Sequence, residues 1–149
     1  MRAVVQRVLK AKVEAAGQTA GKIGKGLLVY LSVAATDTTK DAHFIAEKLP
    51  NLRIFPDETG KMNRSAIDID AAILLISNFT LHGDCRKGRR PALNNAAKPQ
   101  LARQLYEKLY QLIAEQGISI QKGLFGEYML VTSVNDGPVT FLLDSSRLF

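Results

Sequence analysis

Ser77 and Thr80 are two hydroxyl-bearing residues at the point where an apolar segment of the chain runs into a strongly basic one. A hydroxyl becomes a nucleophile when a neighbouring base, usually a histidine, takes its proton. His82 follows Thr80 by two residues, so their side chains would share one face if this segment were an extended strand. The residues alone favour a simpler interpretation, in which both hydroxyls lie at a strand end and bond to the backbone.

Cys85 is the only cysteine, and it lies three residues after His82. Nearby cations favour the reactive thiolate form of a cysteine. A three-residue separation in a loop gives little support to a paired Cys–His site, so a catalytic thiol is a minor alternative. One cysteine and two histidines also predict no intrachain disulfide and no structural zinc site.

Four cations follow within five residues: Arg86, Lys87, Arg89 and Arg90. Arginine forks match phosphate oxygens, and Gly88 lets the backbone come close to a ligand. The whole chain has a net charge of +6, with 20 Lys and Arg against 14 Asp and Glu, which favours a polyanionic partner. The alternative is a flexible, solvated loop. The basic loop (residues 86–90) is therefore predicted to bind phosphates.

The segment NDGPVT, residues 135–140, lies between two apolar runs. Asn-Asp-Gly in this setting predicts a hairpin turn, with Pro138 opening an edge strand. A cis bond between Gly137 and Pro138 is uncommon in general, and it would turn the two flanking carbonyls the same way.

The remaining segments give the elements that must position these residues. Residues 1–17 alternate well enough for one or two strands, residues 17–26 suggest a turn region, and residues 26–35 and 71–79 are apolar strands. One helix, carrying His43 on its surface, is capped at Thr36 or Asp37 and ends or kinks near Pro50. A second begins at Lys98–Pro99 and is ended by Gly117. The rest of the chain, after Gly117, is strand-like.

The order of strands, helix, strand, helix and strands, without repeats or linkers, predicts one compact α/β domain over residues 1–149. This length allows a single core without disulfides. No apolar run approaches the roughly 20 residues of a membrane span, and Arg2, Gln6 and Arg7 interrupt any signal peptide, so we expect a cytoplasmic protein.

Six blocks of the sequence, in this order, resemble the D-aminoacyl-tRNA deacylase family. They are MRAVVQRV, GKGLLVYL, NLRIFPDETGKMN, SNFTL followed by RKGRRP, GLFGEYM and NDGPVT. The match spans nearly the whole chain. It implies the family's layered fold, a mixed, largely antiparallel and barrel-like sheet with two main helices.

The resemblance implies an editing hydrolase that proofreads aminoacyl-tRNA for translation. The family cleaves the ester that joins a D-amino acid, or glycine, to the 3′-terminal ribose of tRNA, as a homodimer without cofactor or metal. The expected partners are the 3′ end and acceptor stem of an aminoacyl-tRNA and a second copy of this chain.

The family's motifs fall on particular positions of this sequence. The catalytic segment would comprise Ser77, Phe79 and Thr80, and the substrate-binding residues would be Asn78, Leu81, Met129, Gly137 and Pro138. The cis Gly137–Pro138 dipeptide would reach into the partner's pocket and exclude L side chains.

The family's chemistry needs few acid–base residues. The 2′-OH of the terminal adenosine would help to activate water, and the backbone N–H groups of Phe79 and Thr80 would bind the oxyanion. An alternative makes Thr80 itself the nucleophile. Arg86, Lys87, Arg89 and Arg90 would lie near the acceptor-stem phosphates, a role inferred from their chemistry.

Three positions depart from the family's usual pattern. Asn78 and Leu130 stand where glutamines are usual, and His82 stands where a tyrosine is usual. These changes support one alternative, an RNA-binding module with weakened catalysis. Another is a small-ester hydrolase that uses Cys85 or Thr80 and needs no RNA.

Overall fold

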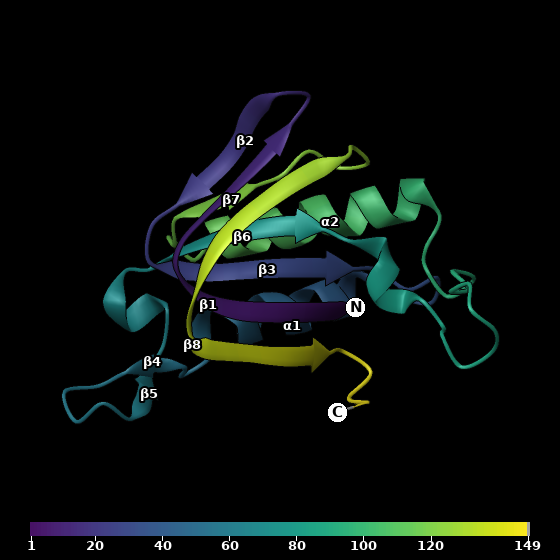
Figure 1. Ribbon diagram of the computed structural model, residues 1–149. Coiled ribbons are helices and arrows are strands. Elements are labelled where there is room, and N and C mark those ends of the chain that lie inside the picture. Colours follow the sequence, from purple (N-terminus) through teal and green to yellow (C-terminus); the bar gives the residue numbers. More distant parts are fainter. Residues whose placement is uncertain (149) are drawn as a thin grey trace.

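A six-stranded sheet with two helices on one of its faces makes up the described part of the chain (Figure 1). This computed structural model describes residues 1–148. The strands of the sheet are β1 (Arg2–Ala15), β2 (Gln18–Ile23), β3 (Gly26–Ser32), β6 (Ala72–Ser77), β7 (Ile120–Lys122) and β8 (Met129–Asp144). The helices are α1 (Thr39–Asn51) and α2 (Pro99–Ala114). Smaller elements are β4 (Phe55–Pro56), β5 (Met62–Arg64) and the 3-10 turns η1 (Ile67–Ile69) and η2 (Phe79–His82).

Strand β1 organises the sheet. It pairs antiparallel with β8 along one edge, and with β3 and then β2 along the other. Strands β3, β6 and β7 continue the sheet as parallel neighbours. Strand β2 folds over this parallel part, where a Cβ added to Gly21 would lie 2.9 Å from Leu74 Cδ1. The sheet is thus nearly closed, and the predicted mixed, barrel-like fold is confirmed.

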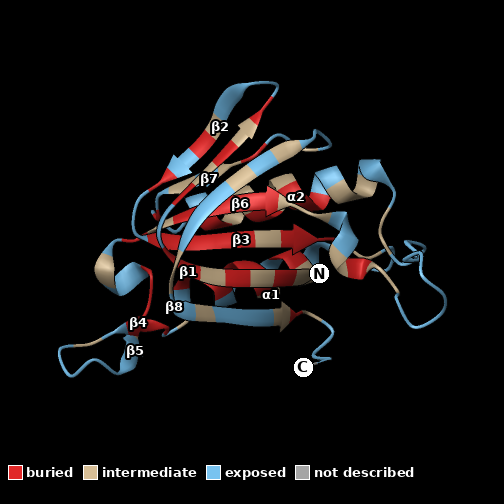
Figure 2. Cartoon of the chain, viewed as in Figure 1, coloured by how far each residue is buried: buried red, intermediate tan, exposed pale blue. Residues whose placement is uncertain are grey.

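Alternate residues of the central strands fill two cores. On the helix side, Leu27, Val29 and Leu31 of β3 pack with residues of α1 and α2. On the other side, Leu28 and Leu74 lie inside the curled sheet. Figure 2 shows β3 and β6 almost wholly buried, whereas β8 is largely exposed. Burial on both faces explains why these two strands have near-continuous apolar sequences.

The helix boundaries follow local signals, with one correction. The cap of α1 is Thr38, whose N–H donates to the Asp41 carboxylate at 2.8 Å. The predicted cap at Thr36 or Asp37 is wrong because Asp37 is engaged elsewhere, 2.8 Å from the α-ammonium group of Met1. Helix α2 begins with Pro99, as predicted. Within residues 1–148, neither helix is long and apolar enough to cross a membrane.

Two predicted turns are wrong. Residues 18–23 form β2, and residues 135–140 form no hairpin, because β8 continues through them. Both halves of β8 pair with β1, and the register shifts around Val8. The Gly137–Pro138 bond is cis. A bulge in one long strand thus replaces the turn between two strands, and the edge position predicted for Pro138 is correct.

Candidate active site

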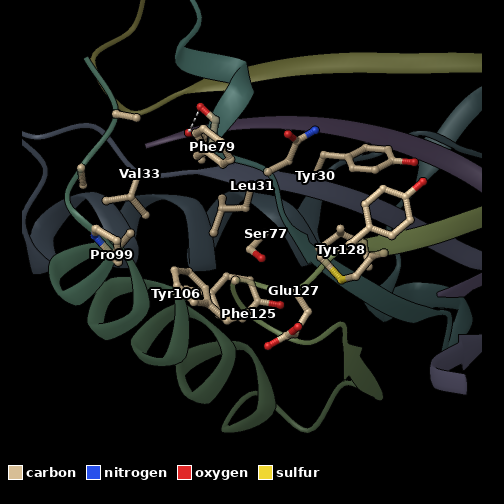
Figure 3. A pocket seen from close by; sticks show the side chains of 18 of the residues that line it. Tyr30, Leu31, Val33, Ser77, Phe79, Pro99, Tyr106, Phe125, Glu127 and Tyr128 are labelled. Carbon is tan, nitrogen blue, oxygen red and sulfur yellow. Dashed lines mark hydrogen bonds between the residues drawn. The ribbon is translucent and has the colours of Figure 1, made fainter. Parts of the chain in front are cut away.

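A pocket of about 620 Å³ opens at the carboxyl ends of β3 and β6. The two strands are parallel, so their carboxyl ends meet at one edge of the sheet, a common place for ligands. The first turns of α2, residues 125–129 and Val131 complete its walls. Figure 3 shows Ser77 in the middle of the view, with Phe79 on one side and Tyr106 and Phe125 on the other.

Four of the predicted site residues line this pocket: Ser77, Asn78, Phe79 and Met129. Ser77 is the last residue of β6, and its hydroxyl has no hydrogen-bond partner within residues 1–148. Thr80 and Leu81 follow on η2, directly beside the pocket. The structure therefore brings the predicted catalytic segment together at one rim.

The turn η2 presents backbone donors at this rim. In the described residues, no hydrogen bond uses the N–H of Phe79 or Thr80, because the first donors of a helical turn have no partner within it. The Thr80 hydroxyl donates to the Asn78 side-chain oxygen. Phe79 is 57% exposed and Thr80 is exposed as well, so the turn that carries these donors lies at the surface.

His82 does not share a face with Thr80. The segment is a 3-10 turn, in which residues two apart point in different directions. His82 is buried, and its Nδ1 lies 2.6 Å from Ser32 Oγ. Burial, with the nearby Arg2 cation, lowers the pKa of His82 below its ordinary 6.5. Thr80 and the exposed Cys85 therefore both lack the histidine base that the sequence suggested.

Aromatic rings form the opposite wall. The ring centroids of Tyr106 and Phe125 are 5.6 Å apart, and the Arg103 guanidinium lies 5.2 Å from the Phe125 centroid. The Tyr106 hydroxyl donates to the Leu75 carbonyl at 2.8 Å, and burial raises its pKa. Tyr106 was missed from the sequence because its spacing on α2 also fits a core residue.

Further groups that the sequence did not indicate line the pocket. Among the described residues that line the pocket, Glu127 alone has a charged side chain. Tyr128 beside it is 82% exposed. Ser32 also lines the pocket, although it is only 2% exposed. Its place at the end of a buried strand was the one signal that could have indicated it.

The basic loop projects beside this site, between η2 and α2 (Figure 1). Arg86 already forms a bidentate pair with Asp84, at 2.6 and 2.9 Å, and this pair holds the pKa of Asp84 at about 2. Lys87, Arg89 and Arg90 are exposed. Three of the four predicted cations thus face solvent without a charged partner in the described residues.

Gly137 and Pro138 lie outside the pocket of their own chain. The β-sheet pairing puts Gly137 and Pro138 on β8, beside Arg7. Measured from Ser77, the dipeptide lies three strands across the sheet and four residues along the strand direction. Strand spacings place the two sites roughly 20 Å apart. The Arg7 guanidinium donates to the Asp136 carbonyl at 3.2 Å and to the Ile54 carbonyl at 2.6 Å. One chain therefore does not join the two motifs.

The departures at Asn78 and Leu130 have different surroundings. Asn78 lines the pocket and bonds to Thr80. Leu130 is 57% exposed and lies on the face of β8 opposite to its neighbours Met129 and Val131, which line the pocket. The side chain of Leu130 therefore lies outside this pocket.

Metal ligands are not gathered anywhere in residues 1–148, where no three His, Cys, Asp or Glu side chains form a cluster suited to an ion.

The sequence model of the D-Tyr-tRNA(Tyr) deacylase family matches residues 4–144. The chain belongs to this family. The enzyme class expected from the sequence, a hydrolase of the deacylase family, is confirmed with it. The D-aminoacyl-tRNA deacylases of Thermosipho africanus (strain TCF52B) and Fervidobacterium nodosum (strain ATCC 35602 / DSM 5306 / Rt17-B1) are 52% and 51% identical to this family member. Both alignments extend over 149 residues and cover 100% of both chains.

Two solved structures share the fold of this deacylase-family chain. One, described as a c-Myc DNA unwinding element binding protein, has a TM-score of 0.91 and 37% identity, covering 97% of this chain and 98% of its own. The other, a probable eukaryotic D-amino acid tRNA deacylase, has a TM-score of 0.84 over 95% of this chain and 97% of its own. At 14% identity, the second likeness concerns the fold alone.

Proposed function

We propose that this chain hydrolyses the ester of D-aminoacyl-tRNA and spares the corresponding L ester. The observation that supports this most is the turn at Phe79 and Thr80, which offers two unused N–H donors at the rim of a ligand-sized pocket. Donors placed in this way stabilise the oxyanion of an ester undergoing attack. The full-length relatives named for this activity support the same substrate.

Water would attack the ester carbonyl carbon, and the bond from that carbon to the ribose 3′ oxygen would break. The products are a free amino acid and a tRNA with its 3′-OH restored. In the described residues, the Thr80 hydroxyl bonds to the Asn78 amide and not to a base that could take its proton, since His82 bonds to Ser32. We therefore assign activation of water to the 2′-OH of the substrate and positioning to the protein.

Selection against L-amino acids would come from the Gly137–Pro138 dipeptide of a second copy of this chain. The separation of about 20 Å within one chain supports a role across a dimer. Within residues 1–148, strand β8 pairs along one edge only, with β1, and it exposes Leu130, Val134, Phe141 and Leu142. Such an edge favours association with another protein surface. Glycine would be accepted because it has no side chain to exclude.

The RNA would run from the pocket toward the basic loop, where Lys87, Arg89 and Arg90 are exposed. Phosphate contacts of this kind give affinity that falls as salt rises.

Deacylation of D-tyrosyl-tRNA, L-tyrosyl-tRNA and glycyl-tRNA by the purified protein tests the proposal. We expect rapid loss of the D-tyrosyl and glycyl esters and survival of the L-tyrosyl ester. Salt-sensitive tRNA binding without turnover would instead identify an RNA-binding module. Equal rates on a simple D-aminoacyl ester and on tRNA would identify a small-ester hydrolase.

A further inference from the structure

His82, Ser32 and the Phe79 carbonyl form a connected set behind the rim of the pocket. His82 Nδ1 lies 2.6 Å from Ser32 Oγ, and Ser32 Oγ donates to the Phe79 carbonyl at 3.3 Å. His82 and Ser32 are 8% and 2% exposed. A buried polar set of this kind fixes the groups that it joins, because breaking it leaves unpaired polar atoms.

The three groups link separate parts of the chain. Ser32 ends β3, whereas Phe79 and His82 are the first and last residues of η2. With a proton on Nδ1, His82 donates to Ser32 and Ser32 donates to Phe79, so each oxygen has a donor. The set therefore ties both ends of η2 to β3, 50 residues away in sequence.

Charged groups from three sides face this histidine. Arg2 of β1 donates to the Leu81 carbonyl of η2 at 2.8 Å and pairs with Asp144 of β8 at 3.0 Å. The α-ammonium group of Met1 and the carboxylate of Asp37 complete the surroundings. A proton added to His82 would place a further cation near Arg2, which holds the neighbouring carbonyl of the same turn, and near the Met1 α-ammonium group.

We propose that His82 is a positioning residue for deacylation, acting through Ser32 to hold the turn that carries the Phe79 and Thr80 N–H donors. The inference rests on the proposed function, which gives those donors their role. It assigns no proton transfer to His82. The neutral imidazole is the working form, because the turn is then held without repulsion of Arg2.

Steady-state kinetics on D-tyrosyl-tRNA test this assignment. We expect His82→Ala and Ser32→Ala each to lower kcat about tenfold, the effect of one hydrogen bond, with KM changed less than about twofold. The double variant should be no slower than the slower single variant, because both residues act through one path. Multiplying effects, an unchanged kcat, or a loss confined to KM would overturn the assignment.

A conservative variant separates positioning from bulk. In His82→Asn, the side-chain amide replaces the imidazole near Nδ1 and does not titrate, so we expect most of kcat to return. The pKa of His82 in the folded protein lies below its ordinary 6.5, so wild-type kcat should fall only at a pH below that value, and this acid limb should be absent in His82→Asn. The exposed His43→Asn is the matched control and should keep the limb. An acid limb that survives in His82→Asn would contradict the proposal.

A readout without substrate distinguishes failure of the inference from failure of the proposed function. The chain has two histidines, so His43→Asn leaves His82 as the one titrating imidazole. In NMR spectra, protonation of His82 should shift the amide resonances of Phe79 and Thr80, and Ser32→Ala should remove this response. If the amide resonances of Phe79 and Thr80 do not shift when His82 is protonated, the inference is wrong even when deacylation is found. If they respond and no ester is cleaved, the positioning contact holds and the proposed reaction is wrong.

Discussion

Arg7 and Asp136 form a largely buried ion pair, with 3.0 Å between Nε and Oδ2, directly before the Gly137–Pro138 bond. Arg7 also donates to the carbonyls of Ile54 and Asp136. One guanidinium thus joins β1, the segment before β4 and the bulge of β8. Arg7 therefore holds the backbone directly before Gly137 and Pro138 in place.

Arg7→Lys removes the fork that reaches these acceptors. A lysine keeps the charge but satisfies fewer acceptors in this geometry, so we expect a loss of about 3 kcal/mol in the free energy of unfolding. Urea denaturation measures it. Arg53→Lys is the control, because Arg53 also donates to a backbone carbonyl but is exposed, and it should cost less than about 1 kcal/mol. Equal losses of unfolding free energy in the two variants would show that the burial of Arg7 does not determine its effect.

Gly137→Ala tests the geometry of the bulge. Gly137 has φ +141°, and an added Cβ would lie 2.6 Å from Val139 Cγ2 and 2.9 Å from Val139 N. The backbone must move, so we expect the ratio of D- to L-tyrosyl-tRNA cleavage to fall at least tenfold. Gly60→Ala is the control, with φ +80° and open space around the added Cβ. An unchanged ratio in folded Gly137→Ala would exclude the dipeptide from chiral selection.

Leu142→Glu tests the proposed association through β8. Leu142 is 53% exposed on the largely exposed strand β8, and a buried carboxylate at an interface costs several kcal/mol. We expect the variant to elute as a monomer with light-scattering detection and to lose discrimination between D and L esters. Met62→Glu, equally exposed on β5, should leave the mass unchanged. A monomer that still discriminates between D and L esters would show that one chain selects its substrate without a partner.

Charge removal from the basic loop should change the salt dependence of tRNA binding. Each of Lys87→Gln, Arg89→Gln and Arg90→Gln should reduce the slope of log K against log salt by about 0.7 to 0.9, if that cation contacts a phosphate. Arg86→Gln should change it less, because Asp84 already neutralises this residue. Fluorescence anisotropy with labelled tRNA across a salt series measures the slopes. If all four variants keep the wild-type slope, the RNA binds elsewhere on the protein.

The lowered pKa of His82 predicts acid sensitivity of folding. The unfolded chain binds more protons at this site than the folded chain once the pH falls below 6.5, so the free energy of unfolding decreases there. The loss is complete below the folded pKa. Asp57, Asp68 and Asp84 have pKa values below their ordinary 3.8 and act at lower pH. Urea denaturation from pH 8 to pH 5 should show a decline in the wild type that His82→Asn lacks.

Local signals in the sequence were sufficient for the strands and helices of the central layer. The unbroken apolar run before Ser32 predicted a strand buried on both faces, and Pro99 marked the start of α2. Both signals come from a few neighbouring residues, so they predict structure without information about the rest of the fold.

Features that depend on distant partners were not predictable in this way. The segment around Gly137 has the local pattern of a hairpin, but β1 pairs with both of its flanks. His82 looked like a partner for Thr80, and the turn directs it instead to Ser32. Phe125 reaches the pocket from far along the chain, through its contact with Tyr106. Each outcome was decided by tertiary packing.

Strand β8 limits how this chain can change during evolution. It carries Met129 in the pocket wall, the Gly137–Pro138 bulge, and Asp144, which anchors Arg2. Because side chains alternate along a strand, one inserted residue before the bulge would turn Met129 outward and Leu130 inward. The length of β8 should therefore stay constant through the lineage.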